Sequence, residues 1–398
     1  MQQIQIGKTL DVEIVERQLA ELWKQTAGDR DADDEAAVLR ARVANLLVFV
    51  PSDSMLNEVK QMLAELTAIH PSRVPLMLGR RTGADRDIEM FVTSLCETDK
   101  RGVKRLCCEE VTLKAQGSFV AELPSAALPL LVPDLSTFLW WRDSIQTSDK
   151  VFQSLLRASD RLVIDSGEFA DPEYELVETH KLFDEKTPGT VAISDLNWAR
   201  LTFWRSLLAD FYDVPTCRSW LDRIDHVRID YVAPESKPTT VAPQALLIAG
   251  WLASRLGWSL PGDQLPGKNN ETLSFRLSGN DRGSSQGETT AVGDREIRLD
   301  LNRVEPDERK PGRLVQVELR TGNHGSFSVA RSPDNLRLLT EARLGTKIHR
   351  GRVLTVRNRS AARLLSREME ILCNDRIYQE ALAVATRMID RTTKPPNE

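Results

Sequence analysis

The chain has 398 residues, of which 41% are hydrophobic and 28% charged, and its formal net charge is −5. This composition is that of an ordinary globular protein with room for about two domains. No apolar run reaches the roughly 18 residues that a membrane span needs, and the first residues lack the basic and apolar regions of a signal peptide. The five Cys form no regular framework. We therefore expect a cytoplasmic protein without membrane contact.

The first 185 residues predict an α/β domain. An amphipathic helix is expected within residues 10–24. Residues 43–50 are a near-continuous apolar run typical of a buried strand, the apolar spacing over 55–66 indicates a helix, and residues 73–79 begin the next strand. Further strands are expected over 88–96, 106–115, 135–141 and 161–165, the last being the final strand of the domain. This pattern predicts a strand–helix–strand mixed sheet.

Residues 186–398 predict an α+β domain with an antiparallel-rich sheet and packed helices. We expect helices over 195–213, 245–256 and 377–389, the second ending at Gly257, with Gly250 at a close approach of a neighbouring element. Strands are expected over 227–231, 296–301, 315–320 and 327–329, the last two joined by a hairpin turn. The fold class is therefore α/β plus α+β, in two domains over residues 1–185 and 186–398.

The segment over residues 195–213, DLNWARLTFWRSLLADFYD, concentrates aromatic side chains that are only 6% of the chain. On a helix, Trp198 and Trp204 fall in one apolar half, and Arg200 and Arg205 fall in the same half. Such a guanidinium must reach solvent, stack on an indole or meet an anion. Two interpretations stay open: a core helix with Arg at its edges, or a partner surface, since Trp and Arg commonly anchor interfaces.

Trp140, Trp141 and Arg142 follow one another at the end of an expected strand. Neighbouring side chains on a strand point to opposite faces. We therefore expect at least one of the two indoles to reach either the surface of the domain or the junction between the domains, and all three residues are candidates for an interface or a fold-critical position.

Positive charge gathers near the end of the chain. Residues 298–398 hold 20 Lys and Arg against 13 Asp and Glu, and residues 342–367 hold eight basic residues and no acid. This block is either a solvated face or an electrostatic contact for an acidic protein, a phosphorylated ligand or nucleic acid. The acidic remainder of the chain argues against nucleic acid. The candidate contact residues are Arg350, Arg352, Arg357, Arg359 and Arg363.

Motifs of catalysis are missing from the sequence. There is no G-x-G-x-x-G, Walker A, G-x-S-x-G, H-E-x-x-H or C-x-x-C pattern, and the five His lie far apart. We therefore expect no catalytic residues, no cofactor and no metal. Cys373, with Arg376 three residues on, is either a small buried hydrophobic side chain or a thiol tuned by nearby positive charge.

Several segments together resemble the glucose-6-phosphate dehydrogenase assembly protein family, the OpcA family. The matching stretches occur in family order and span about residues 40–260. They read HPSR, LWWRD, RLVIDS, DLNWARLTFWR and GWLASRLGW, beginning at His70, Leu139, Arg161, Asp195 and Gly250.

The resemblance implies a non-catalytic protein that binds glucose-6-phosphate dehydrogenase and promotes its active oligomer, in support of NADPH production. It also implies regulation through cysteines in cyanobacterial relatives. Cys373 is the candidate redox residue here, but it is the one Cys of the last 180 residues, so a local C-terminal disulfide is not available. The alternative from another class is a sensor or enzyme that binds a sugar phosphate with its own Arg cluster. A nucleic-acid binder is a third reading, and it predicts steep salt dependence.

Overall fold

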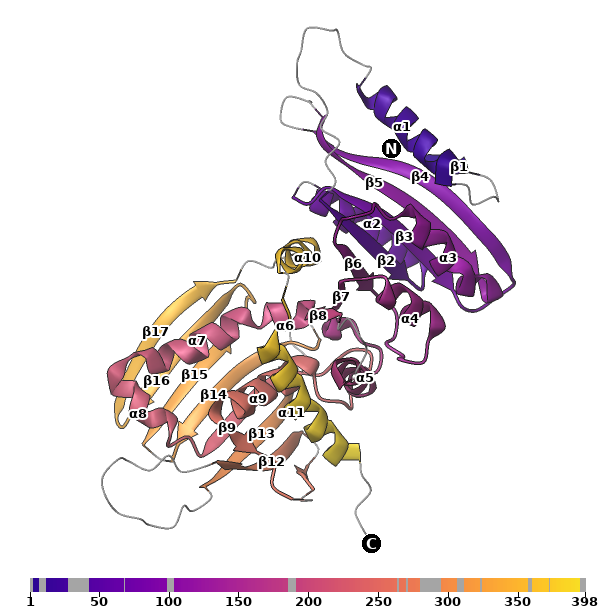
Figure 1. Ribbon diagram of the computed structural model, residues 1–398. Helices are drawn as coiled ribbons and strands as arrows, with labels where there is room; N and C mark the ends of the chain where they lie inside the picture. The colour runs from indigo at the N-terminus through magenta and orange to yellow at the C-terminus, as the bar shows by residue number, and fades with distance from the viewer. Residues whose placement is uncertain are drawn as a thin grey trace. The chain divides into compact units, whose positions relative to one another are not determined.

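The computed structural model of the protein divides into two compact units (Figure 1). Unit 1 holds residues 1–165, 186–196 and 359–374, and unit 2 holds residues 166–185, 197–358 and 375–398. The structure describes residues 3–6, 12–27, 43–67, 69–98, 104–184, 191–262, 265–269, 271–279, 295–305, 311–322, 324–356, 360–371 and 373–393. The side chains of residues 94–108 lie outside this description.

Unit 1 is built on an eight-stranded sheet in the order β1-β4-β5-β3-β2-β6-β7-β8. The central strand β2 is buried at all seven positions, because helices cover both faces of a parallel sheet. The strands are β1 (Gln3–Ile6), β2 (Ala44–Val50), β3 (Ser72–Arg80), β4 (Arg86–Thr98), β5 (Lys104–Gln116), β6 (Thr137–Trp141), β7 (Arg161–Ile164) and β8 (Ala192–Asp195).

Six strands of this sheet run parallel, from β5 at one end through β3, β2, β6 and β7 to β8 at the other. Numbered along the chain, their spatial order is 3-2-1-4-5-6, the order of the doubly wound dinucleotide-binding fold. The strand β4 pairs with β5 in antiparallel orientation, and β1 pairs with β4 in the same way, so β4 and β1 lie outside the parallel set. The strand order reverses between β2 and β6, where such folds open a crevice at the carboxyl ends of the strands.

The helices of unit 1 include one from the far end of the chain. Helix α10 contacts α2, with Ser360 donating to Glu65 at 2.8 Å and Glu370 lying 3.4 Å from His70. The helices are α1 (Val12–Ala27), α2 (Asp53–Thr67), α3 (Leu123–Ala127), α4 (Lys150–Arg157) and α10 (Ala361–Glu370), with short 3-10 turns η1 (Gly117–Glu122) and η2 (Leu128–Leu130).

Unit 2 is built on a nine-stranded sheet, in the order β10-β12-β13-β9-β14-β15-β16-β17 with β11 on β12. All neighbouring pairs are antiparallel except β13 with β9. The strands are β9 (His226–Val232), β10 (Trp258–Ser259), β11 (Gly267–Lys268), β12 (Thr272–Gly279), β13 (Arg295–Val304), β14 (Leu314–Thr321), β15 (Gly325–Arg331), β16 (Arg337–Leu344) and β17 (Lys347–Thr355).

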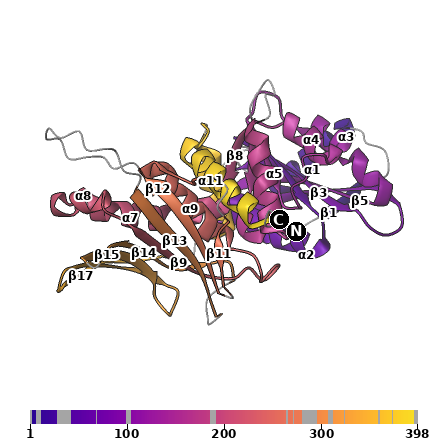
Figure 2. The same ribbon diagram turned by 90° about the horizontal axis from the view of Figure 1, so that it is seen from below.

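Helices cover one face of this sheet, and Figure 2 shows α7, α8 and α9 on the same side of it. The ring of Phe327 on β15 contacts Phe211 and Tyr212 of α7, and α9 packs on β9. The helices are η3 (Ser166–Glu168), α5 (Pro172–Asp184), α6 (Leu196–Arg200), α7 (Thr202–Asp213), α8 (Pro215–Leu221), α9 (Pro243–Leu256) and α11 (Arg376–Thr393).

The close packing expected at Gly250 is confirmed. A Cβ atom added there would collide with the carbonyl oxygen of Ala381, because α9 lies directly against α11. Helix α9 ends at Gly257, whose φ of 68° is the left-handed conformation that closes many helices.

The predicted fold class is confirmed: unit 1 carries a mostly parallel sheet with helices and unit 2 a mostly antiparallel one. Three details differ. The helix expected over 195–213 is broken at Leu201, where its amide bonds to the Trp198 carbonyl in a tighter turn. Strand β8 follows β7 in the first sheet, so residues 161–165 are not its last strand. The strands β16 and β17 lie where we expected only a basic block.

The compact units differ from the predicted ranges of residues 1–185 and 186–398. Residues 166–185 join unit 2, and residues 186–196 and 359–374 join unit 1. The exchange follows from pairing and packing, since β8 completes the parallel sheet and α10 lies on α2. The chain therefore passes between the units more than once.

Candidate functional site

The carboxyl edge of the parallel sheet is lined by ion pairs between distant parts of unit 1. Arg80, at the end of β3, binds both carboxylate oxygens of Asp53 at 2.6 and 2.7 Å. Arg81 donates to Asp143 at 3.0 Å and also binds Asp149. These contacts occupy the sheet edge at which a doubly wound fold receives its ligand.

The first turn after β2 lacks the features that hold a dinucleotide phosphate. It reads Pro51-Ser52-Asp53, without the glycines that let a backbone approach pyrophosphate. Asp53 begins α2 and brings a carboxylate to the helix end that would attract an anion. Its hydrogen bond with Arg80 lowers the pKa of Asp53, so the group stays ionised. A second anion is therefore disfavoured at this turn.

Trp140 and Trp141 are both buried, 1% and 2% exposed, so neither indole is open to solvent. Trp141 stacks on Phe49 of the neighbouring strand β2, with ring centroids 4.3 Å apart. Arg142 lies over Trp140 at 5.3 Å, and its side chain is only 4% exposed. These three residues build the interior beside the sheet edge.

Trp198 is held between elements that are far apart in the sequence. Its indole NH donates to Asp375 at 2.7 Å, and its ring packs on Tyr378 of α11. The Arg205 guanidinium lies 3.5 Å from the Trp198 ring centroid, which is the stacking arrangement considered for this segment. The indole therefore connects α6 to α11 within unit 2.

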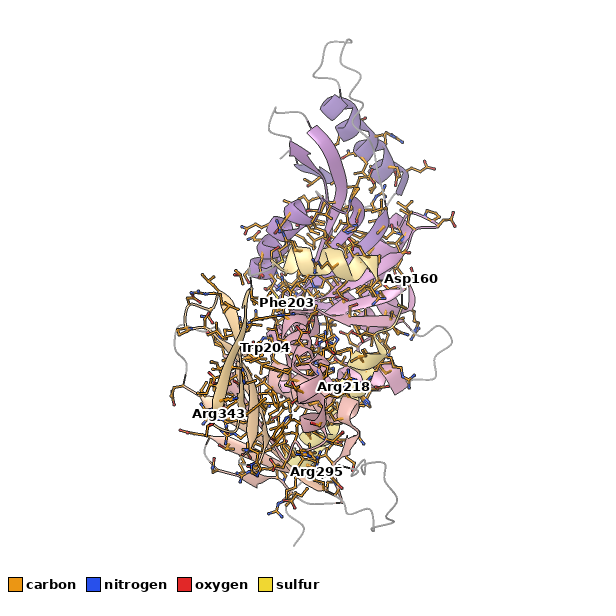
Figure 3. The ribbon with its side chains drawn as sticks, turned by 90° about the vertical axis from the view of Figure 1, so that its left-hand side faces the viewer. Asp160, Phe203, Trp204, Arg218, Arg295 and Arg343 are labelled. Carbon is orange, nitrogen blue, oxygen red and sulfur yellow. The ribbon has the colours of Figure 1, made fainter. Side chains whose placement is uncertain are left out.

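Trp204 is 1% exposed and lies among the side chains packed against the sheet (Figure 3). Arg331 of β15 covers its ring at 5.6 Å. Arg200 is half-buried at the last position of α6. Both tryptophans of the segment thus belong to the core of unit 2.

Amide side chains beside this segment form a buried chain of hydrogen bonds. Gln244 donates to Asn197 at 2.7 Å, and Asn197 donates to Ser166 at 3.1 Å. The side-chain carbonyl oxygen of Gln244 accepts a hydrogen bond from the backbone amide of Leu314, which connects α9 to β14. Each contact is internal, so the network orients the start of α6 and leaves no open site.

The basic block divides between two elements. Arg352 is on β17, 78% exposed, and binds Asp210 of α7 at 2.9 Å. Arg363 is on α10 in unit 1, 68% exposed, and binds Glu65 at 3.2 Å. Arg350 is on β17, but its side chain lies outside the described residues, as do Arg357 and Arg359 entirely. The block therefore does not form a single helical or strand face.

Cys373 is exposed, so the expectation of a small buried hydrophobic side chain is wrong. It lies between α10 and α11, and its backbone carbonyl accepts from Arg161 at 2.9 Å. Among the described side chains, no group of three or more His, Cys, Asp and Glu could hold a metal ion. None of the helices in the described part is long and apolar enough to cross a membrane.

Two family models match this chain consecutively. Residues 64–181 match the model described as the glucose-6-phosphate dehydrogenase subunit N-terminal domain, and residues 191–382 match that of the C-terminal domain. This chain belongs to the OpcA family. The two matches meet between residues 181 and 191, an interval that contains the predicted domain boundary.

Relatives within the OpcA family are similar in sequence but longer. The OxPP cycle protein OpcA of Synechococcus elongatus is 29% identical over 306 residues, which cover 75% of this chain and 64% of that protein. The OpcA protein of Nostoc punctiforme is 34% identical over 195 residues, covering 49% of this chain and 40% of that one. The chain thus spans less than two thirds of these relatives.

Among solved structures, this OpcA-family chain is similar to glucose-6-phosphate 1-dehydrogenase from Mycobacterium avium. The TM-score is 0.53 at 12% identity, covering 90% of this chain and 93% of the other. At this identity the similarity concerns the fold alone. The parallel sheet followed by a large, mostly antiparallel sheet is therefore an oxidoreductase-like architecture.

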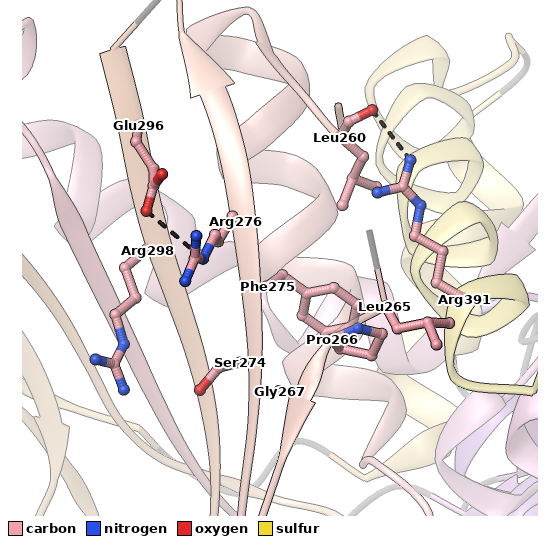
Figure 4. A pocket seen from close by; sticks show the side chains of 10 residues that line it. All are labelled: Leu260, Leu265, Pro266, Gly267, Ser274, Phe275, Arg276, Glu296, Arg298 and Arg391. Atoms are coloured by element: carbon pink, nitrogen blue, oxygen red, sulfur yellow. Dashed lines mark hydrogen bonds and ion pairs between the residues drawn. The ribbon is translucent and has the colours of Figure 1, made fainter. Parts of the chain in front are cut away.

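A hollow of about 620 Å³ lies in unit 2 beside β12 (Figure 4). Arg391 of α11 points into it and donates to the Leu260 carbonyl at 3.1 Å. Arg276 lies 3.7 Å from Glu296 on the opposite side. Because these guanidinium groups already have acceptors, the hollow offers a weak site for an additional phosphate.

Sequence reasoning missed a set of charged pairs on the second sheet. Arg228 and Asp230 share one face of β9, and Glu318 and Arg320 share one face of β14. Burial alone would raise the pKa of Asp300 on β13, but hydrogen bonds from Ser274, Arg298 and His226 outweigh it and lower that pKa. The signal was present, because the alternation that predicts the strand at 227–231 also places its charges two residues apart.

Proposed function

We propose that this protein is a non-catalytic assembly factor and activator of glucose-6-phosphate dehydrogenase. It binds the dehydrogenase and promotes its active oligomer, which supports NADPH production in the oxidative pentose phosphate pathway of the cytoplasm. The observation that carries the proposal is the match of residues 64–181 and 191–382 to the two domains of a family described as a dehydrogenase subunit.

The geometry of unit 1 supports the non-catalytic part of the proposal. An oxidoreductase of this architecture would place a dinucleotide at the carboxyl edge of the parallel sheet. Here Asp53 brings negative charge to the start of α2, and Arg80 and Arg81 are engaged with carboxylates of the same unit. A phosphate would have to displace these contacts.

The exposure of the candidate residues supports two different roles for them, one in the fold and one in partner binding. Trp198 and Trp204 are 4% and 1% exposed, which favours a supporting role in the fold. Arg352 and Arg363 are mostly exposed, which favours a direct electrostatic contact. We place the partner contact on the basic block and its support on the aromatic segment.

The test mixes the purified chain with the dehydrogenase of the same organism and measures complex mass and specific activity. We expect a complex heavier than either protein and a higher specific activity. A single charge reversal, Arg352→Glu, and the double reversal at Arg357 and Arg359 should each weaken binding about tenfold and reduce its salt sensitivity. Arg376→Glu is the matched control, because Arg376 is 87% exposed on α11 outside the block.

The outcomes separate the proposal from the sugar-phosphate alternative. Absence of a complex and of any activity change would overturn the assembly role. A rise in melting temperature with glucose 6-phosphate or NADP, in the absence of dehydrogenase, would instead favour the sensor or enzyme. Equal binding by the reversed variants and the control would remove the basic block from the interface.

A further inference from the structure

One face of the unit 2 sheet carries charged side chains at alternate positions, opposite the face that the helices cover. Along β14, Val317 and Leu319 are buried toward α7 and α9, while Glu318 and Arg320 point the other way. The charged side chains line a hollow of about 530 Å³ together with Arg228, Glu341 and Arg343. We call this surface the charged face.

The strand register aligns these charges into two rows that cross the strands. In the register, basic residues of neighbouring strands lie opposite one another: Arg276 lies beside Arg298, and His226 lies beside Arg320. The basic row consists of Arg276, Arg298, His226, Arg320 and Arg343. The acidic row, two residues along each strand, consists of Asp300, Glu318 and Glu341, with Arg228 between the first two.

Three Arg of the basic row, Arg298, Arg320 and Arg343, pair with the carboxylate two residues away on their own strand. Arg276 pairs instead with Glu296 of β13, and His226 lies 2.9 Å from Asp300 of β13. Arg298 binds Asp300 at 2.9 Å, and Arg320 binds Glu318 at 2.7 Å. The side chain of Arg298 is 62% exposed and that of Arg320 is 41% exposed, whereas the Asp300 side chain is 8% exposed. Among the described side chains of this face, five Arg are each paired with a carboxylate when Glu296 and Asp230 are included. This balance disfavours a polyanion such as nucleic acid and favours a partner with matching stripes of charge.

We propose that the charged face binds the charged face of a second copy of this chain. A two-fold axis that runs across the strands between the two rows places the basic row of one copy over the acidic row of the other. Arg320 then faces Glu318 of the other copy, and Glu318 faces Arg320, as an isologous contact requires. The strands β13, β14 and β16 each supply an Arg to one row and a carboxylate to the other, and β12 supplies Arg276 and Ser274. The strand β9 supplies His226 and Arg228 to the two rows and adds no opposite charge to them.

Exposed apolar side chains on β16 and β17, at one end of the charged face, provide apolar area that a contact with a second copy would bury. Leu339 on β16 and Val353 on β17 are paired in the register and lie 38% and 60% exposed. Ile348, paired with Arg343, is 53% exposed. Exposed aliphatic side chains grouped beside paired charges are typical of the border between the core and rim of an interface.

The test is the mass of the full chain alone, by sedimentation over a range of protein and salt concentrations. We expect a dimer that weakens as salt rises. Arg320→Glu and Glu318→Arg should each weaken dimerisation at least tenfold, because each sets like charges opposite one another. The double exchange of the two residues restores opposite charges across the axis and should recover most of the affinity.

Controls keep the test decisive. Arg376→Glu changes an exposed cation on α11, outside the charged face, and should leave the dimer unchanged. If Arg320→Glu fails to fold by circular dichroism, Arg343→Glu replaces it, since Arg343 is 55% exposed at the end of the basic row.

Three results would overturn the proposal. The first is a monomer at all concentrations up to about 100 μM, well above the dissociation constants of stable homodimers. The second is a double-exchange variant that dimerises as weakly as the single variants do. The third is a wild-type monomer whose binding to the dehydrogenase, or stabilisation by inorganic phosphate, is lost in Arg320→Glu. The dehydrogenase assay described above uses a different readout, so either proposal can fail alone.

Discussion

The two sheets of this protein both carry arginine–carboxylate pairs, but the pairs are of opposite kinds. At the edge of the unit 1 sheet they join residues far apart in the sequence, separated by 27 positions for Arg80 and Asp53 and by 62 for Arg81 and Asp143. On the charged face of unit 2 four of them join residues two apart on one strand, such as Arg320 and Glu318, and one joins Arg276 to Glu296 of the neighbouring strand.

The difference has a physical consequence. A pair between distant segments fixes the arrangement of those segments, so breaking it disturbs the fold. A pair within one strand fixes nothing, because the strand is already held by its neighbours. Local pairs can therefore exchange their acceptors for those of a partner at small cost, whereas bridging pairs cannot. The first kind suits a closed crevice and the second an interface.

The largest effect that tests this comparison is expected at the most buried pair between distant segments, that of Arg73. Arg73 is fully buried and binds Glu109 at 2.6 Å and Glu16 at 2.8 Å. Arg73→Ala should lower the free energy of unfolding by about 3–5 kcal/mol, because Glu109, only 1% exposed, loses this guanidinium partner in a buried place. Urea unfolding measures the effect. A loss below about 1 kcal/mol would show that bridging pairs do not hold unit 1.

A smaller effect is expected at the exposed bridging pair. Asp53→Ala removes the Arg80 contact and a favourable charge at the start of α2, and should cost about 1 kcal/mol. The matched variant Glu318→Ala removes a local pair and should change the stability of the monomer by less than about 0.5 kcal/mol. Thermal unfolding of both at low protein concentration makes the comparison. Equal losses would contradict the distinction between the two kinds of pair.

The smallest effect appears as a pH dependence. The pKa of Asp300 is lowered in the folded state, so its ionised form stabilises the fold above the unfolded value of about 4, and this stabilisation disappears as pH falls through the lower folded value. Asp300→Asn should therefore be less stable than the wild type at pH 7, with the difference shrinking toward pH 3. Melting temperatures across this range test the sign; a difference that grows on acidification would refute it.

The sequence predicted the fold where one period dominates a segment. The apolar run at residues 44–50, interrupted only by Asn45, and the apolar helix ending at Gly257 could be predicted without knowledge of their neighbours. Strand β8 could not be found, since its four residues become a strand only by pairing with β7. The same holds for β16 and β17, whose charged residues hid the alternation.

The candidate site was harder to predict, because its contacts join remote segments. Trp198 was identified as an apolar anchor, but its partner Asp375 lies 177 residues away, and no local pattern indicates that pairing. For Trp140 and Trp141, strand alternation gave opposite directions correctly, yet both sides of a doubly covered sheet are interior. The interface roles of the basic block stay predictions.

The position of α10 has a consequence for how the protein is made. This helix covers α2 in unit 1, with Leu364 and Leu365 buried beneath it, although it is encoded near the end of the chain. A ribosome therefore synthesises nearly all of unit 2 before the first unit can be completed. Until α10 is made, the apolar surface of α2 that it covers stays exposed to chaperones. A chain that stops before residue 360 leaves that surface uncovered permanently.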